Sequence, residues 1–227
     1  MAVIAENLQA TRSQIAAAQK AENQTVTLVV VSKSQPIDYI EKSIKAGQRI
    51  FGENYVQEAV EKIKALQDYD LEWHFIGPIQ SNKTKPIAEH FDWVQSVDRL
   101  KIAERLNDAR SDDKARLNIC LQVNVSGEAS KSGVAPSEAE NLAREITRLP
   151  RLQLRGLMAI PEVTHDAAEQ RKAFRIMKNL FEQLKQQGYA LDTLSMGMSG
   201  DFKMAIAEGA THVRIGSAIF GERKKSA

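Results

Sequence analysis

The chain has 227 residues, with 31 lysines and arginines against 29 aspartates and glutamates. This length is near the upper range for one hydrophobic core and predicts a single domain over residues 1–227. The balanced charge argues against nucleic acid as the main partner. Only one cysteine, Cys120, is present, which excludes a disulfide framework and a cysteine-based metal site. We expect no bound metal ion.

The sequence has no apolar stretch approaching the roughly 20 residues that a membrane span needs. Its N-terminus lacks the basic stretch followed by an apolar core that marks a secretory signal. We therefore expect a soluble, cytoplasmic protein that does not bind membranes.

Strand-like and helix-like segments alternate along the chain, without a Gly/Ser linker or an internal repeat. This alternation is typical of a parallel sheet with crossover helices. Several strand-like segments are continuous apolar runs rich in Val and Ile, as expected for strands covered on both faces. In chain order, the strands are predicted at residues 27–33, 49–54, 73–77, 93–97, 117–125, 152–160, 193–199 and 212–215.

An extra helix is expected before the first strand, within residues 1–22. The remaining helices are predicted at residues 37–46, 56–66, 100–108, 136–148, 167–187 and 201–208. Eight strands with crossover helices predict an α/β fold of the (β/α)8 TIM-barrel type. The alternative is an open doubly wound sheet, which usually has fewer strands and a Gly-rich first turn. Neither G-x-G-x-x-G nor G-x-x-x-x-G-K-[ST] occurs in the sequence.

Polar residues follow most of the predicted strands, and in a barrel all carboxyl ends of the strands surround one mouth. Lys33 ends the apolar run 27–32, and a lysine at that edge can act as a nucleophile. Taken alone, Lys33 is more simply a solvated residue at a strand end. The other strand ends favour a pocket, and they carry Asn54, His74 to Pro78, Gln122 to Asn124, Met158 to Pro161, Met196 to Ser199 and Arg214 to Ser217.

Two small, donor-rich pairs, Ser199-Gly200 and Gly216-Ser217, end the last two predicted strands and precede helical turns. Either pair alone is more typical of a turn or a cap. Together they predict an anion site, because backbone N–H groups at helix starts, serine hydroxyls and glycines suit phosphate. Barrels of this type often place phosphate after strands seven and eight.

A lysine opposite a phosphate site suggests a phosphorylated aldehyde held as a Schiff base, and pyridoxal 5'-phosphate (PLP) meets that description. Arg214 precedes the second pair and could face the pyridine nitrogen of this cofactor. Because a guanidinium does not give up its proton, that nitrogen would stay unprotonated and the cofactor would be a poor electron sink. The alternative for Arg214 is a buried ion pair with a strand neighbour.

Long segments also match a known family, in order and over nearly the whole chain. They are Val31 to Ser34, Phe51 to Glu58, Trp73 to Lys83, Lys131 to Gly133, Arg155 to Met158, Met196 to Ser199 with Asp201, Val213 to Gly216, and Phe220-Gly221. In these segments the chain resembles the pyridoxal phosphate homeostasis proteins, single-domain relatives of the alanine racemase barrel. The resemblance implies that Lys33 carries the cofactor as a Schiff base and that Arg214 faces the ring nitrogen. It also implies that Asn54 lines the ring and that the phosphate is held by Ser199, Gly216 and Ser217.

Racemases of the related fold need a second acid or base, typically a tyrosine from a separate β-domain of a partner subunit. The sequence ends at Ala227, just past the eighth predicted strand, so we expect no such domain, no catalytic residue and a monomer. The resemblance implies a non-catalytic protein of vitamin B6 homeostasis that binds, buffers or delivers PLP. Other B6 vitamers and PLP-dependent apoenzymes are candidate partners. The alternatives are an amino-acid racemase or another PLP-dependent enzyme, and a regulatory interaction protein.

Two further features are interpreted without a role in cofactor binding. Lys83 and Lys85 follow the third predicted strand, and they either recruit a second anion or form the solvated start of a helix. His74 lies between two aromatic residues and is expected to be a hydrogen-bonded core residue.

Overall fold

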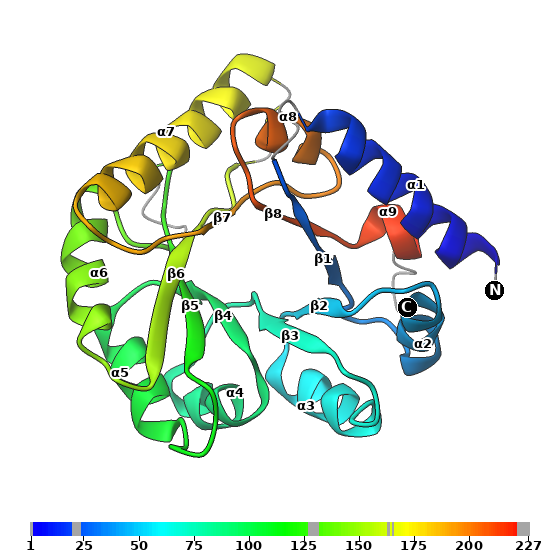
Figure 1. Ribbon diagram of the computed structural model, residues 1–227, viewed down its shortest axis with the longest axis horizontal. Coiled ribbons are helices and arrows are strands. Elements are labelled where there is room, and N and C mark those ends of the chain that lie inside the picture. Colours follow the sequence, from blue (N-terminus) through cyan, green and yellow to red (C-terminus); the bar gives the residue numbers. More distant parts are fainter. Residues whose placement is uncertain (1, 20–23, 127–131, 163, 165, 222–227) are drawn as a thin grey trace.

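A closed barrel of eight parallel strands forms the centre of the molecule, and helices surround it (Figure 1). The computed structural model describes residues 2–19, 24–126, 132–162, 164 and 166–221. The strands are paired in chain order, from β1 to β8, and β8 pairs with β1. The predicted (β/α)8 fold is therefore confirmed. The strands are β1 Thr27–Val31, β2 Ile50–Glu53, β3 Glu72–Phe75, β4 Trp93–Val97, β5 Leu117–Gln122, β6 Leu152–Met158, β7 Thr193–Ser195 and β8 His212–Ile215.

Helices follow the strands in the expected places. In the described part of the chain they are α1 Ala2–Ala18, α2 Ile37–Lys45, α3 Val56–Ala65, α4 Thr84–His90, α5 Leu100–Ala109, α6 Ala139–Thr147, α7 Ala167–Gln186, α8 Phe202–Ala207 and α9 Ser217–Phe220, with 3₁₀ turns at Ser81–Lys83 and Pro136–Glu138. Helix α4 was not among the predicted helices and was foreseen only as one alternative for Lys83 and Lys85, because it is short, contains Pro86 and lacks apolar periodicity at its start.

The helix α1 contacts α2, α8 and α9, and so lies beside the place where the barrel closes (Figure 1). Since α9 has only four residues, α1 covers a surface that a longer eighth helix would cover. Of the range 1–22 predicted for the first helix, residues 1 and 20–22 lie outside the described residues. Within the described residues, no helix has the length and apolar character to cross a membrane.

Several strands end earlier than the sequence predicts. The first was predicted to reach residue 33 but ends at Val31, and the seventh was predicted over 193–199 but ends at Ser195. In both places the backbone turns away from the sheet, with a positive φ of 60° at Ser34 and of 96° at Gly197. The segments that follow these two strands leave the sheet and line the mouth of the barrel, with Lys33 and Gln35 after β1 and Met198 and Ser199 after β7.

The main apolar core lies between the barrel and its helices, and Leu8, Ile40, Phe51, Leu106 and Phe174 are among its fully buried members. The barrel interior also holds buried polar side chains, among them His74, Gln95 and Ser195. Cys120 packs with Trp93 and Met158 in a separate buried cluster, and burial raises the pKa of its thiol. A buried thiol with a raised pKa is a poor nucleophile, so this environment makes Cys120 unreactive.

Gly156 allows β6 to approach β7 closely, because a Cβ atom added at this position would lie 1.7 Å from the carbonyl oxygen of Thr193. We expect Gly156→Ala to lower the free energy of unfolding by about 3 kcal/mol, since two strand backbones would have to separate. Gly200→Ala is the matched control, because no atom lies within 4 Å of its added Cβ, and we expect a change under about 0.5 kcal/mol. Urea unfolding of both variants measures the difference, and equal stabilities would contradict it.

Candidate functional site

A cavity of about 260 Å³ opens at the carboxyl ends of the strands. All six site residues predicted from the sequence line it, namely Lys33, Asn54, Ser199, Arg214, Gly216 and Ser217. They come from the ends of β1, β2, β7 and β8 and lie far apart in the sequence. The structure therefore brings the predicted residues together, while their roles toward a ligand stay predictions. The apolar residues Ile76 and Ile160 also line the cavity. Both lie within the strand-end segments 74–78 and 158–161 that the sequence placed at this mouth, although neither was named as a site residue.

Lys33 lies in the turn after β1, and the residue before it is held by a buried ion pair. Ser32 Oγ donates a hydrogen bond to Glu53 Oε1 at 2.7 Å, and the Ser32 carbonyl accepts one from Lys62 Nζ at 2.7 Å. Lys62 Nζ also lies 2.8 Å from Glu53 Oε1. Burial raises the pKa of Glu53, although Lys62 and Ser32 oppose this effect. The position of Lys33 thus depends on an ion pair that the helix α3 supplies.

The residue after Lys33 is held by the same helix. The backbone N–H of Ser34 donates to Glu58 Oε1 at 2.6 Å, and this oxygen lies 2.5 Å from Lys62 Nζ. Ser34 adopts a positive φ, a conformation that costs about 1 kcal/mol or more for a residue other than glycine. The contact with Glu58 offsets this strain. Sequence reasoning missed Lys62, since a lysine on an amphipathic helix gives no sign that it is buried.

Arg214 is buried on β8 with its guanidinium at the cavity wall. Its Nη1 donates to Ser195 Oγ at 2.7 Å and its Nη2 donates to the carbonyl oxygen of Ala159 at 2.8 Å. Burial lowers the pKa of Arg214 to about 10, so the side chain keeps its positive charge at neutral pH. Among the described residues no carboxylate forms an ion pair with it, so the alternative of an ion pair with a strand neighbour is not found.

The turn after β7 carries Ser199 and Gly200 to the cavity. Asp201 Oδ1 accepts a hydrogen bond from the Met198 N–H at 2.5 Å, and the Met198 carbonyl accepts from the N–H of Asp201 and of Phe202. These contacts fix the turn at the start of α8. Because the N–H groups of Asp201 and Phe202 are paired with the Met198 carbonyl, the donors that this turn offers to an anion are those of Ser199 and Gly200.

The turn after β8 lies against the end of β1. A Cβ atom added at Gly216 would lie 2.9 Å from the carbonyl oxygen of Val31, so only glycine fits there without a shift. Ser217 follows as the first residue of α9. The close approach at Gly216 places the donor-rich start of α9 beside the turn that carries Lys33.

Asn54 reaches the cavity from the end of β2, next to Gly77. A Cβ atom at Gly77 would lie 2.2 Å from the Asn54 carbonyl oxygen, so this glycine permits the local packing. The side-chain oxygen Oδ1 of Asn54 is buried and has no hydrogen-bond partner in the described structure. A buried polar atom of this kind is normally satisfied, and a hydrogen-bond donor on a bound ligand would satisfy it. This orphaned acceptor fits a polar cofactor in the cavity.

The remaining predicted residues have no direct part in the cavity. His74 is fully buried and hydrogen-bonded, as expected for a core residue. Lys85 is 77% exposed and lies 3.9 Å from Glu89, and Lys83 ends a 3₁₀ turn. Neither lysine lines the cavity, which favours the solvated start of a helix. Lys131 of the matching segment lies outside the described residues, and the described residues contain no cluster of potential metal ligands.

A (β/α)8 barrel with a lysine after its first strand and donor-rich turns after its last two defines a barrel of the alanine racemase type. Residues 6–224 match the family described as "Alanine racemase, N-terminal domain". The chain is 55% identical to the pyridoxal phosphate homeostasis protein of Haemophilus influenzae, over 98% of this chain and 97% of the relative. It is 50% identical to that of Escherichia coli K12, over 98% of each. The chain belongs to the pyridoxal phosphate homeostasis protein family.

Solved structures agree with this assignment. The structure of PipY from Synechococcus elongatus PCC7942 with PLP bound is 39% identical and superposes with a TM-score of 0.85, over 96% of this chain and 100% of that chain. Alanine racemase from Corynebacterium glutamicum matches with a TM-score of 0.72 at 16% identity, over 99% of this chain and 62% of that chain. At this identity, the racemase shares the fold alone.

The buried ion pair between Lys62 and Glu53 should contribute to the stability of the fold. We expect Lys62→Met to lower the free energy of unfolding by about 3 kcal/mol at neutral pH, because Glu53 would be left as an unpaired buried charge. Without Lys62 the pKa of Glu53 rises further above its unfolded value. Below the pKa that Glu53 has in the unfolded chain, Glu53 is protonated in both states and the variant keeps most of its stability. The variant loses stability as the pH rises from that value through the higher pKa that Glu53 has in the folded protein.

Denaturant unfolding at about pH 5 and about pH 8 measures this effect, and the deficit of Lys62→Met should be larger at the higher pH. The control is Lys64→Met, an exposed lysine on the same helix, whose change should stay under about 0.5 kcal/mol at both values. A deficit that is independent of pH would argue against a buried charge at Glu53.

Proposed function

We propose that the protein binds PLP in the cavity at the barrel mouth and acts in intracellular vitamin B6 homeostasis. The observation that carries this proposal is the convergence of the six predicted residues on one cavity. The relatives that match over nearly the full length are named for this function, and PipY has been solved with PLP bound. The orphaned Asn54 oxygen and the donors of the two turns suit a polar, phosphorylated ligand.

Each residue has a separate proposed role toward the cofactor. Lys33 binds it covalently: the amine nitrogen bonds to the aldehyde carbon, and the aldehyde oxygen leaves as one molecule of water. Ser199, Gly216 and Ser217 hold the phosphate, because their turns offer backbone N–H groups and hydroxyls. Asn54 lines the ring, and Arg214 faces the ring nitrogen.

We propose further that the protein is not an enzyme. PLP supplies an electron-withdrawing ring when its nitrogen is protonated, and Arg214 cannot provide that proton because a guanidinium keeps its own. Racemisation also needs an acid or base on the face of the cofactor opposite Lys33. Among the described residues that line the cavity, none is a tyrosine, and Tyr55 is exposed outside it.

We propose that the protein is a cytoplasmic monomer that binds PLP and other B6 vitamers and delivers PLP to PLP-dependent apoenzymes. The apolar residue Ile160 lines the cavity and is 42% exposed, so a bound ligand at this mouth would remain accessible to a recipient protein.

Lys33→Ala tests the covalent site. We expect the wild-type protein to show a visible absorption band with PLP, and borohydride reduction should attach the cofactor to the peptide that contains Lys33. Lys33→Ala should lose the band and the modified peptide, whereas Lys64→Ala should keep both, because Lys64 is exposed on α3 away from the cavity. A wild-type protein that stays colourless with added PLP would refute PLP binding at this site.

The non-catalytic role has its own test. Incubation of the PLP-loaded protein with L-alanine or L-serine, followed by chiral chromatography, should show no conversion above that of free PLP. Alanine racemase provides the positive control for the assay. Turnover above the free cofactor that disappears in Lys33→Ala would instead establish an enzyme.

A further inference from the structure

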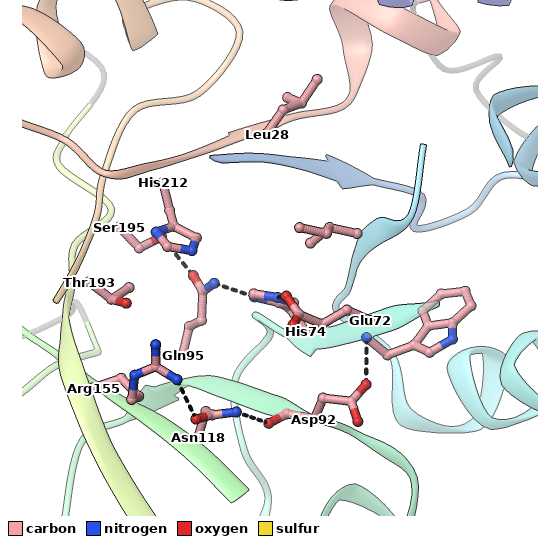
Figure 2. A network of polar contacts seen from close by, with 12 residues as sticks. Leu28, Glu72, His74, Asp92, Gln95, Asn118, Arg155, Thr193, Ser195 and His212 are labelled. Atoms are coloured by element: carbon pink, nitrogen blue, oxygen red, sulfur yellow. Dashed lines mark hydrogen bonds and ion pairs between the residues drawn. The ribbon is translucent and has the colours of Figure 1, made fainter. Parts of the chain in front are cut away.

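A line of five polar side chains crosses the inside of the barrel, from the cavity to the amino ends of the strands. We call it the interior chain. It begins at Arg214 Nη1, which lies 2.7 Å from Ser195 Oγ, and continues from Ser195 Oγ to Gln95 Oε1 at 2.7 Å. Gln95 Nε2 lies 2.7 Å from His74 Nδ1, and His74 Nε2 lies 2.7 Å from Glu72 Oε1. Figure 2 shows Ser195, Gln95 and His74 following one another in this line.

The chemistry of these groups fixes the direction of every hydrogen bond. Arg214 can only donate, so Ser195 Oγ accepts and directs its own hydrogen to the Gln95 carbonyl oxygen. The Gln95 amide nitrogen then faces His74 Nδ1, which must accept. The ring hydrogen of a neutral His74 is consequently on Nε2, where it donates to the Glu72 carboxylate. Every hydrogen bond of the interior chain is therefore donated in the same direction, from Arg214 at the cavity toward Glu72 at the amino ends of the strands.

The reverse arrangement is unfavourable. If the Gln95 amide were flipped, Ser195 would accept from both Gln95 and Arg214, and its own hydrogen would have no partner in the interior chain. His74 would then have to donate from Nδ1, and a neutral ring would face the Glu72 carboxylate with a lone pair. A doubly protonated ring could bridge both sides, but burial lowers the pKa of His74 despite the nearby Glu72 and Asp92.

The members of the interior chain are packed inside the barrel, and this packing fixes the orientation of the Ser195 hydroxyl at the cavity end. Ser195, Gln95 and His74 are fully buried, and they come from β7, β4 and β3. His74 also stacks on the Trp93 ring, with the ring centres 5.1 Å apart. Arg214 therefore meets a hydroxyl whose acceptor lone pairs are aimed by partners on the far side of the barrel.

We propose that Ser195, Gln95 and His74 are positioning residues that fix the guanidinium of Arg214 against the ring nitrogen of the cofactor. This inference rests on the proposed function and adds residues that do not touch the cofactor. The two anchored nitrogens leave the other guanidinium donors for the cavity, and the fixed direction of Ser195 determines the plane of the group. Loss of a member of the interior chain frees Nη1 and leaves only the bond from Nη2 to the Ala159 carbonyl, so the guanidinium can turn and its contact with the ring nitrogen weakens.

The primary test uses Ser195→Ala and Gln95→Met, each of which removes two hydrogen bonds of the interior chain without adding charge. We expect the dissociation constant for PLP, measured by equilibrium dialysis, to rise about tenfold in each variant, as for the loss of one hydrogen bond to a charged group. The visible absorption band of the bound cofactor should shift in the same way in both. In the double variant the second substitution should add little, because the link is already broken.

Thr193→Val is the matched control. Thr193 is also fully buried on β7, and its hydroxyl bonds Asp192 Oδ1 at 2.8 Å, outside the interior chain. This variant should lose stability as the others do but keep the wild-type dissociation constant and absorption band. If wild type binds PLP and the Ser195 and Gln95 variants bind it equally well, the positioning role is refuted and the proposed function stands. If wild type does not bind PLP, both are refuted.

A second measurement needs neither a variant that folds poorly nor the cofactor. The ring nitrogens of His74 in the wild-type protein can be observed by NMR of ¹⁵N-labelled histidine, with the four histidines distinguished by single substitutions. A neutral ring with its hydrogen on Nε2 at neutral pH supports the direction of the interior chain. A hydrogen on Nδ1 would overturn it.

Discussion

The pairing of β1 with β8 closes the barrel, and the candidate site depends on it. This pairing sets Val29 opposite Arg214, so the strand that leads to Lys33 lies beside the strand that carries the arginine. Gly216 continues the contact past the strands, because its lack of a side chain lets it approach the Val31 carbonyl. Lys33, Arg214 and the turn at Gly216 are thereby placed side by side at the carboxyl ends of the strands. Any separation of these two strands would disassemble all three.

Two buried cations support the site in different ways. Lys62 has carboxylate partners, and its charge holds the turn around Lys33 through Glu53 and Glu58. Among the described residues, the hydrogen-bond partners of Arg214 are both neutral, namely the Ser195 hydroxyl and the Ala159 carbonyl oxygen. Burial of charge is unfavourable unless hydrogen bonds compensate for lost water, and neutral partners compensate less than a carboxylate. Arg214 is therefore the member whose charge remains most available to a ligand.

The residues that line the cavity could be predicted from the sequence better than the residues that hold them in place. Lys33, Arg214 and the two Gly/Ser pairs could be predicted because each follows a recognisable strand, and parallel strands in a barrel end at one mouth. The alternation of strands and helices predicted the fold for the same reason, since periodicity is a local property. Strand ends were less accurate, because apolar runs such as the one through Ser195 to Met198 continue into the lining of the cavity.

The sequence by itself determined the (β/α)8 fold, the family and six of the residues that line the cavity, because these follow from local patterns and from the order of the strands. Only the tertiary structure decided which side chains support them. Lys62 is seen as a surface lysine until α3 places it under the turn of Lys33. Ser195 and Gln95 are 100 positions apart, and only closure of the barrel joins them. Such contacts depend on the distances between strands, which no local pattern of residues encodes.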